Sequence, residues 1–498
     1  MSEASIQNTI SPYIQTTISP YTQTPICTRL LLSEADLDSL IAESVKAHKS
    51  WKKVPLEKRI EVARKWLEEF EKIADVARED IAIQMGRPIG SCEGETNGTI
   101  WRARHIVDIA ADCLAPIPQS KPPVEGLEKY IVKQPLGVIC VISPWNYPHL
   151  CLVNTVVAAL ISGNAVILKP APQTPSPAER WVSTWQAAGL PSNVLQVAHL
   201  SQERTLRQLV PDPRIDFVSF TGSVAGGKAV QQAASNGQGF KGTCLELGGN
   251  DPAYVREDVN IKFAAEQLVD GVVYNSGQSC AAVERIYVHS AIYDEFVREY
   301  IEIAKQLKLG DPTRLTTTLG PVVSVASAAR IRKQVKDAGM SMVLGRELKS
   351  IVALGAQIVL DESFFPKAKE GTALVGPIVL TNVNHSMEIM TEETFGPVVG
   401  IQKVEGDEEA LSLMNDSIYG LTASVWTNPA DPQSIAVFNH FVDELECGTV
   451  YLNKSDALDP SLPWSGWKNS GRGVSLSAFV YDHVNHTKSV MKRMAVPQ

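Results

Sequence analysis

The chain has 498 residues, of which 44% are hydrophobic and 20% charged. Because one domain typically has roughly 100 to 200 residues, we expect two to four structural units around a large core. A formal net charge of -9 provides no global positive field for a phosphate backbone, so nucleic acid is not an expected partner. No apolar stretch reaches ~18 residues and polar residues follow Met1, which predicts a cytoplasmic protein with no membrane segment.

The eight cysteines are scattered, with no C-x-x-C pair and no clustered histidine spacing. This distribution predicts reduced thiols and no metal site. Since free cysteine is among the most buried residue types, we expect most of these thiols to be inert core residues.

The N-terminal part begins with a tandem octapeptide, TISPYIQT at 9–16 and TISPYTQT at 17–24. Its polar composition is typical of a flexible arm or of short edge strands. Ser33 and Asp36 form a capping-box pattern, which predicts a helix after Ser33. Pro55 opens a second helical stretch, which should end before Gly86-Arg87-Pro88.

From residue 137 onward, short apolar runs alternate with helical patterns. The expected strands are 137–142, 165–170, 194–197, 217–220 and 244–247. This alternation predicts an α/β fold with a doubly wound parallel sheet, which binds ligands at the carboxyl ends of its strands. A Pro-rich segment at 115–135 marks a domain boundary. The tail, YDHVNHTKSV, has a strand pattern and could pair with the 125–135 ribbon of this or another subunit.

Two glycine-containing segments are candidates for binding a dinucleotide. Gly237, Gly239 and Gly242 spell G-x-G-x-x-G, but they follow a helical pattern and precede a strand, the reverse of the required order. The string FTGSVAGG instead places Gly222 and Ser223 between a strand and a helix. Backbone amides and the helix N-terminus at that point could receive a pyrophosphate.

Three other segments each place one reactive side chain at the end of an apolar run. These are Asn146 in SPWNYP, Glu246 in LELGGN and Cys280 in NSGQSC. Singly, they could be a turn former, a satisfied buried carboxylate and a small core residue. Together they supply an amide donor for an oxyanion, a carboxylate base and a thiol nucleophile, beside the candidate dinucleotide site.

These strings, in this order, resemble the aldehyde dehydrogenase superfamily. Further matching strings are SGNAVILKP, AGLPSNVLQV, EETFGPV, NDSIYGLTASVWT and WSGWKNSG. The resemblance implies a Rossmann-like dinucleotide-binding domain, an α/β catalytic domain, a return segment to the cofactor-domain side and a β-strand oligomerisation arm of a homodimer or homotetramer. In this sequence the dinucleotide-binding domain would cover 1–115 and 136–248, and the catalytic domain 249–448. The return segment would cover 449–479, and the oligomerisation arm 116–135 and 480–498.

The resemblance also implies the reaction, the oxidation of an aldehyde to a carboxylic acid with NAD or NADP. Cys280 would attack the aldehyde carbon, Asn146 and the Cys280 N–H would hold the oxyanion, and water activated by Glu246 would hydrolyse the thioester. The implied cofactor-binding residues are Trp145, Lys169, Gly222, Ser223, Gly227, Leu247, Glu393 and Phe395. The implied substrate pocket consists of Tyr147, Cys151, Tyr274 and Trp464.

Three positions depart from the family pattern. Thr155 and Ser475 stand where many hydrolytic members have Lys and Glu, which predicts that protons leave through water or backbone groups. Pro172 stands three residues after Lys169, in place of the usual Glu. A carboxylate there would repel a 2′-phosphate, so its absence predicts use of both NAD and NADP.

Alternative functions remain open but are less favoured. The first alternative is a CoA-acylating relative, which would not need Glu246. The second is a non-catalytic relative, in which retention of all three reactive residues is unexpected. The third is a cysteine hydrolase, which would need a histidine near Cys280. The substrate class also stays open. The apolar and aromatic lining favours a bulky neutral aldehyde. Asp456 and Asp459 would favour a cationic amino-aldehyde such as betaine aldehyde, unless they are solvated acids of an exposed loop.

Overall fold

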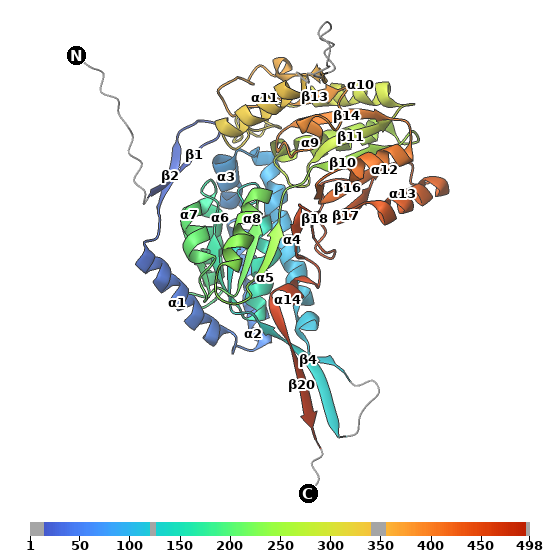
Figure 1. Cartoon of the computed structure of the whole chain (residues 1–498). Coiled ribbons are helices and arrows are strands. Elements are labelled where there is room, and N and C mark those ends of the chain that lie inside the picture. The colour runs from blue at the N-terminus through green and yellow to red at the C-terminus, as the bar shows by residue number, and fades with distance from the viewer. Residues whose placement is uncertain (1–13, 120–125, 340–354, 495–498) are drawn as a thin grey trace, which may run out of the picture.

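The computed structural model describes residues 14–119, 126–339 and 355–494 (Figure 1). Residues 9–13 of the first octapeptide, and residues 120–125 and 495–498 of the predicted arm, lie outside this part. The N-terminal hairpin pairs β1 (Ile14–Ile18) with β2 (Pro25–Leu30) in antiparallel register, so the second octapeptide supplies the turn of short strands.

The first predicted helix is confirmed as α1 (Glu34–Trp51). The Ser33 hydroxyl accepts a hydrogen bond from Asp36 N at 3.1 Å, and the Asp36 side chain completes the capping box. The second helical stretch is two helices, α2 (Leu56–Lys72) and α3 (Ala74–Met85), because Ile73 leaves helical geometry between them. Helix α4 (Ile89–Leu114) follows and was not expected as a separate element.

The first large sheet contains the five predicted strands, each within two residues of its expected bounds. They are β5 (Val138–Ile142), β6 (Ala165–Lys169), β7 (Leu195–Val197), β8 (Phe217–Thr221) and β9 (Gly242–Glu246), which pair in parallel. A late strand, β19 (Gly471–Arg472), joins β9 in antiparallel register and gives the order β19-β9-β8-β5-β6-β7. The connecting helices are α5 (Leu150–Ser162), α6 (Pro175–Ala187), the short α7 (Gln202–Arg204) and α8 (Val224–Ser235).

This strand order places a topological switch point between β5 and β8. The chain moves outward from β5 through β6 to β7, and then returns to add β8 and β9 on the other side of β5. Helices that follow β5 and β8 therefore diverge, which leaves a crevice at the carboxyl ends of these two strands. The candidate motifs SPWNYP and FTGSVAGG follow these two strands directly.

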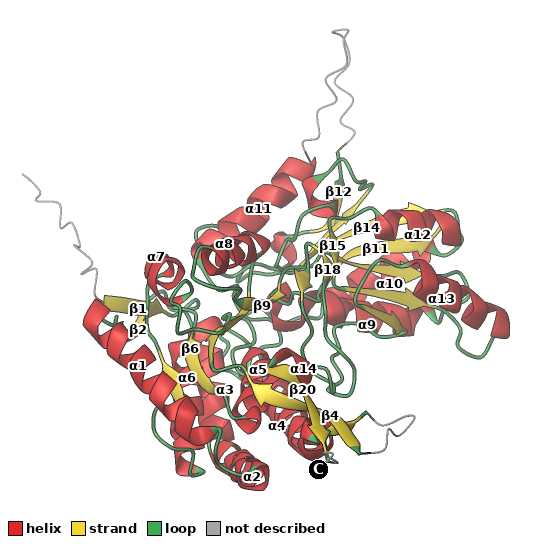
Figure 2. Cartoon of the chain, turned by 60° about the horizontal axis from the view of Figure 1, so that its bottom comes forward, coloured by secondary structure: helices red, strands yellow, loops and turns green. Residues whose placement is uncertain are grey.

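The second large sheet has the order β12-β13-β14-β11-β10-β16-β17. Its strands are β10 (Asp251–Val255), β11 (Val283–His289), β12 (Gln357–Leu360), β13 (Ile378–Thr381), β14 (Val398–Val404), β16 (Thr422–Trp426) and β17 (Thr449–Leu452), all parallel except for the β12–β13 pair. The helices of this part, gathered around the sheet in Figure 2, are α9 (Ile261–Val273), α10 (Tyr293–Ala304), α11 (Val325–Gly339), α12 (Asp407–Asn415) and α13 (Pro432–Glu444).

The C-terminal tail forms the predicted strand within this chain. After the short helix α14 (Val480–His483), β20 (Asn485–Arg493) pairs along its whole length with β4 (Leu127–Pro135), and β3 (Ile117–Pro118) adds a third strand. Figure 1 shows β4 and β20 projecting away from the rest of the chain. A two-residue pair, β15 (Tyr419–Gly420) with β18 (Trp467–Lys468), completes the strands described. The three domains implied by the resemblance stay our proposal.

No helix among the described residues is both long and apolar enough to cross a membrane.

Candidate active site

A pocket of about 320 Å³ lies at the switch point, where the chain after β5, β8 and β9 meets helix α11 and loops that connect elements of the second sheet. This volume is within the range of small-molecule and cofactor sites. Its lining residues are Pro144, Trp145, Asn146, Thr221, Gly222, Ser223, Leu247, Gly248, Cys280, Arg330, Glu393 and Phe395. The structure thus brings the implied nucleophile and oxyanion donor into one pocket with most of the implied cofactor residues.

The implied nucleophile follows an unusual turn. Asn275, Ser276 and Gly277 all have left-handed backbone conformations, with φ of 53°, 58° and 70°. Non-glycine residues rarely adopt this conformation, and such strain is found preferentially at functional sites. At Gly277 a side chain is excluded as well, because an added Cβ would lie 2.1 Å from the carbonyl oxygen of Gly396. This turn delivers Cys280 to the pocket.

Arg87 fixes this turn to the loop that carries Asn146. Its guanidinium donates to Asn275 Oδ1 at 2.8 Å and to the carbonyl oxygen of Asn146, and it is paired with Glu95. The side chains of Arg87, Asn275 and Glu95 are all buried. Sequence reasoning identified Arg87 only as part of a helix end and missed Glu95, because the contacts of Arg87 with Asn275 and Asn146 join segments 188 and 59 residues apart.

Asn146 is placed to donate to an oxyanion. The residue is 5% exposed, and its Nδ2 donates one hydrogen bond to the Gln278 carbonyl oxygen at 3.1 Å. An amide nitrogen carries two hydrogens, so one remains for a ligand. The Cys280 N–H makes no hydrogen bond to the backbone of the described residues, which leaves it as a second donor.

Glu246 ends β9 and lies beside the pocket, without being among its lining residues. Its Oε2 accepts a hydrogen bond from Thr221 Oγ1 at 3.3 Å, and its Oε1 accepts one from Ser475 Oγ. From the sequence, Ser475 was expected only to lack the charge that many relatives have at this position. In the structure, its hydroxyl donates a hydrogen bond to Glu246. Burial raises the pKa of Glu246, and the two hydroxyl donors act against this increase.

Burial also raises the pKa of the other acids and thiols of the site. The pKa of Cys280 lies well above its usual value. Burial, together with the charge of Glu284, raises the pKa of Glu393 to about 8. Strong perturbation of several titratable groups in one pocket is typical of functional sites.

The implied cofactor residues outside the pocket lining have different environments. Lys169 ends β6, is 6% exposed, and has a pKa lowered by burial. Gly227 lies in α8 against Leu247, where an added Cβ would approach Leu247 Cδ2 to 2.5 Å. Its role in the structure is close packing of α8 against the chain after β9.

The N-terminus of α8 lies beside the pocket. The Ser223 hydroxyl caps α8 by accepting from Gly226 N at 3.1 Å, and Ser223 also lines the pocket. A helix N-terminus in this position could receive a phosphate group. Pro172 offers no charge, and its carbonyl oxygen accepts a hydrogen bond from Thr17 Oγ1 at 2.8 Å, which attaches β1 beside this region.

Sequence reasoning missed Arg330, which lines the pocket and donates to the Thr394 carbonyl oxygen at 2.6 Å.

The four implied substrate residues are not among those that line the pocket. The Arg87 guanidinium lies 4.6 Å from the Tyr147 ring centroid, and Tyr274 Oη donates to the Ser91 carbonyl oxygen at 3.1 Å. Burial raises the pKa of Cys151 well above its usual value. Trp464 is 5% exposed and packs in the hydrophobic core, so it does not line an open entrance.

The sequence left open whether Asp456 and Asp459 are solvated acids of an exposed loop. Asp456 is not such an acid. Its Oδ1 accepts a hydrogen bond from the hydroxyl of Ser279, the neighbour of Cys280, at 3.1 Å, and burial raises its pKa to about 6. The interpretation of Asp456 as an acid of an exposed loop is therefore wrong, because this half-buried side chain is hydrogen-bonded to the neighbour of Cys280. Asp459 is exposed, and its carboxylate accepts a hydrogen bond from Ser461 N, as expected for a solvated acid of a loop.

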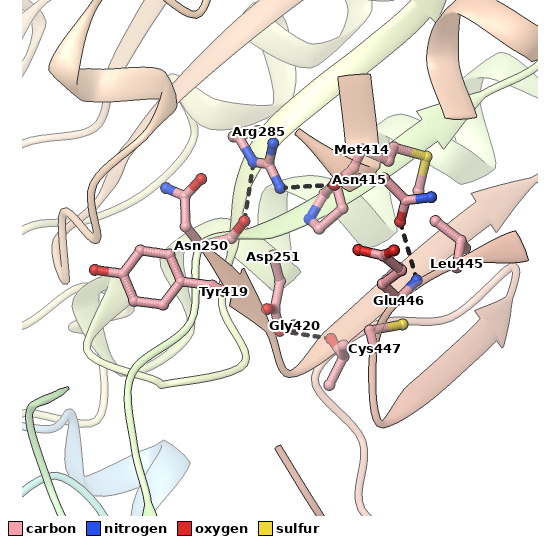
Figure 3. Close-up of a pocket in the computed structure, with 13 residues that line it drawn as sticks. Asn250, Asp251, Arg285, Met414, Asn415, Tyr419, Gly420, Leu445, Glu446 and Cys447 are labelled. Atoms are coloured by element: carbon pink, nitrogen blue, oxygen red, sulfur yellow. Dashed lines mark hydrogen bonds between the residues drawn. The ribbon is translucent and has the colours of Figure 1, made fainter. Parts of the chain in front are cut away.

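A second cavity, drawn in Figure 3, lies between β10 and β16. Its volume of about 10 Å³ holds at most one water molecule. Several of its polar groups are bonded to one another: Arg285 Nε donates to the Asn250 carbonyl oxygen at 2.9 Å, and Thr422 Oγ1 donates to Asp251 at 2.6 Å. It is part of the interior and has no room for an organic substrate.

Comparisons with known proteins agree with this geometry. The family model described as "Aldehyde dehydrogenase family" matches residues 9–490. An aldehyde dehydrogenase of Paenarthrobacter nicotinovorans is 33% identical over 447 residues, which cover 89% of this chain and 92% of the relative. A succinate-semialdehyde dehydrogenase [NADP(+)] of Mycobacterium avium (strain 104) is 32% identical and covers 89% of each chain.

Solved structures have the same α/β fold. The succinic semialdehyde dehydrogenase of Streptococcus pyogenes, solved in complex with NADP+, superposes with a TM-score of 0.86 at 26% identity, covering 97% of this chain and all of the other. The match extends over both large sheets and the arm. The chain therefore belongs to the aldehyde dehydrogenase family and is an enzyme that oxidises an aldehyde with NAD or NADP.

Proposed function

We propose that the chain oxidises its aldehyde to a free carboxylic acid through a thioester on Cys280, which water activated by Glu246 hydrolyses. The observation that carries this proposal is the position of Cys280 and Asn146 in one pocket with the residues proposed for the cofactor. Glu246 lies next to this pocket, attached to Thr221, which lines it.

In the first step the Cys280 thiol gives its proton to solvent water, the thiolate sulfur bonds to the aldehyde carbon, and the carbonyl electron pair moves onto oxygen. The free N–H of Asn146 Nδ2 and the Cys280 backbone N–H stabilise this oxyanion. Loss of one such donor costs on the order of 10²-fold in rate in acyl-transfer sites. Bound NAD or NADP supplies the hydride acceptor that turns this adduct into a thioester.

The second step needs a base close to the acyl group. Glu246 takes a proton from water as the water oxygen bonds to the acyl carbon, and the carbon–sulfur bond then breaks to release the acid and the Cys280 thiolate. A buried carboxylate with a raised pKa is suited to this task, because it accepts a proton more readily than a solvated one.

The residues proposed for the cofactor are the pocket residues Trp145, Gly222, Ser223, Leu247, Glu393 and Phe395, together with Lys169 and the packing residue Gly227. Ser223 and the start of α8 would receive the pyrophosphate. Lys169 would lie against the adenosine ribose, with no carboxylate at position 172 to repel a 2′-phosphate. We therefore propose that both NAD and NADP are used.

For the substrate we propose a neutral aliphatic or aromatic aldehyde. Asp456 alone would favour a cation, but the charges of Arg102 and Arg87 reach the same carboxylate and lower its pKa. A quaternary ammonium group would meet these cations. Since relatives act on succinate semialdehyde, an aldehyde with a carboxylate at its far end is the second candidate, and Arg102 is the cation it would approach.

The test is stopped-flow production of reduced cofactor with an aldehyde panel, with and without CoA. Wild type should turn over without CoA, Cys280→Ala should give no signal, and Glu246→Gln should give one burst followed by slow turnover. A CoA requirement would contradict the hydrolytic step. No signal with aliphatic, aromatic, carboxylated or quaternary-ammonium aldehydes would contradict the whole proposal.

A further inference from the structure

The carboxylate of Glu246 is held by hydroxyl groups from two separate parts of the chain. Thr221 approaches from the end of β8, the strand next to β9. Ser475 approaches from the C-terminal region, because β19 pairs with β9 so that Gly471 lies opposite Glu246. A residue 229 positions later in the sequence thus contacts the proposed base.

The backbone around Ser475 is firmly fixed. Ser475 is 1% exposed, its N–H donates to the Trp464 carbonyl oxygen at 2.9 Å, and its own carbonyl accepts from Trp464 N at 2.8 Å. The next two residues, Leu476 and Ser477, have left-handed φ values of 58° and 49°. Such conformations persist only where the surrounding structure imposes them. The Ser475 hydroxyl therefore has little freedom to leave the carboxylate.

Other groups that face Glu246 come from α4, α5 and its own strand. Arg102, in α4, donates to Asn154 Oδ1 at 3.1 Å, and both Arg102 and the Asn154 amide lower the pKa of Glu246. The thiols of Cys151 and Cys244 also face it, but burial raises the pKa of both, so they stay neutral at ordinary pH. After burial, the Ser475 hydrogen bond is the largest influence on this carboxyl group.

We propose that Ser475 is a positioning residue for Glu246, whose hydroxyl holds the carboxylate in place and keeps it ionised, and hence competent as a base, near neutral pH. The inference rests on the proposed function, since it matters only if Glu246 activates the hydrolytic water. A hydroxyl that donates to a carboxylate stabilises its charged form. Its removal should raise the pKa of Glu246 and make hydrolysis fail at low pH.

The test compares Ser475→Ala with wild type across the pH range, using an aldehyde that gives a burst. A burst means that a step after hydride transfer limits kcat, and an aldehyde is chosen for which kcat is below the separately measured rate of reduced-cofactor release, so that this step is thioester hydrolysis. We expect the acidic limb of kcat to move up by about one pH unit, the effect of losing one hydrogen bond to a charged group. At the foot of that limb kcat should fall roughly tenfold, whereas above it kcat and the burst amplitude should match wild type.

Two variants serve as controls. Ser475→Thr keeps the hydroxyl and should retain the wild-type limb. Ser477→Ala removes a neighbouring buried hydroxyl, which accepts from Phe479 N and is not bonded to Glu246, and should leave the profile unchanged. A Ser475→Ala limb that coincides with wild type would overturn the proposal. Loss of the burst would also overturn it, because the hydroxyl would then act before hydrolysis.

The two proposals fail in different ways. If Glu246→Gln turns over as fast as wild type, Glu246 is not the base and the proposed function is wrong. If Glu246→Gln stalls after the burst but Ser475→Ala keeps the wild-type limb, only the role of Ser475 is wrong.

Discussion

Gly277 offers the sharpest test of how the turn before Cys280 controls activity. Its φ of +70° favours glycine, and a Cβ at this position would lie 2.1 Å from the Gly396 carbonyl oxygen. The left-handed conformation alone costs an alanine about 1–2 kcal/mol. Relief of the overlap requires a movement of backbone, and overpacking of this kind costs a further ~1–3 kcal/mol. Gly277→Ala should therefore lose about 2–5 kcal/mol of unfolding free energy.

The matched control is Gly189→Ala. Gly189 also has a positive φ, of +96°, but no atom lies within 4 Å of its added Cβ. It should lose only the conformational part, about 1–2 kcal/mol, and keep its activity. Displacement of the turn moves Cys280, and a shift of roughly 1 Å can cost 10²-fold in rate, so Gly277→Ala should lose about that much of kcat.

Denaturant unfolding gives the stability of both variants, and burst kinetics give the rate of acylation. If Gly277→Ala keeps kcat within about twofold of wild type and loses no more stability than Gly189→Ala, then the close approach to Gly396 does not hold the turn and the reasoning is wrong.

Three further predictions concern the thiol, the cofactor and the arm. Because burial raises the pKa of Cys280 well above its usual value, and only the thiolate reacts, alkylation of Cys280 by iodoacetamide in the cofactor-free enzyme should keep rising with pH. Peptide mass spectrometry measures it, and a plateau at neutral pH would contradict the burial argument. Pro172→Glu should lower kcat/KM for NADP about tenfold more than for NAD, through repulsion of the 2′-phosphate; equal losses, or a wild type that already rejects NADP by ~10³-fold, would show that selection lies elsewhere. Because the β3–β4–β20 sheet projects with exposed edges, the chain should be a dimer or tetramer by light scattering, and a monomer at micromolar concentration would refute this.

The α/β class and the strands of the first sheet could be predicted from the sequence alone. Parallel strands buried on both faces consist of short apolar runs, and β5 and β6 are buried at every position. The family and its use of NAD or NADP also followed from local strings, and so did our proposal for Cys280, Asn146 and Glu246. SPWNYP directly follows β5 and Glu246 ends β9, whereas NSGQSC follows helix α9.

Contacts between distant segments decided the rest. From the sequence, Asp456 could also be a solvated loop acid. Only its hydrogen bond to Ser279 in the structure shows that it is not. Arg87 carries no local signal of its hydrogen bond to Asn275, which lies 188 residues later in the chain. Ser475 lies next to Glu246 because β19 joins the edge of a sheet built more than 200 residues earlier. A hydroxyl replaces the charged group expected there, and no local pattern can reveal such a partner, since its position depends on how the whole chain closes.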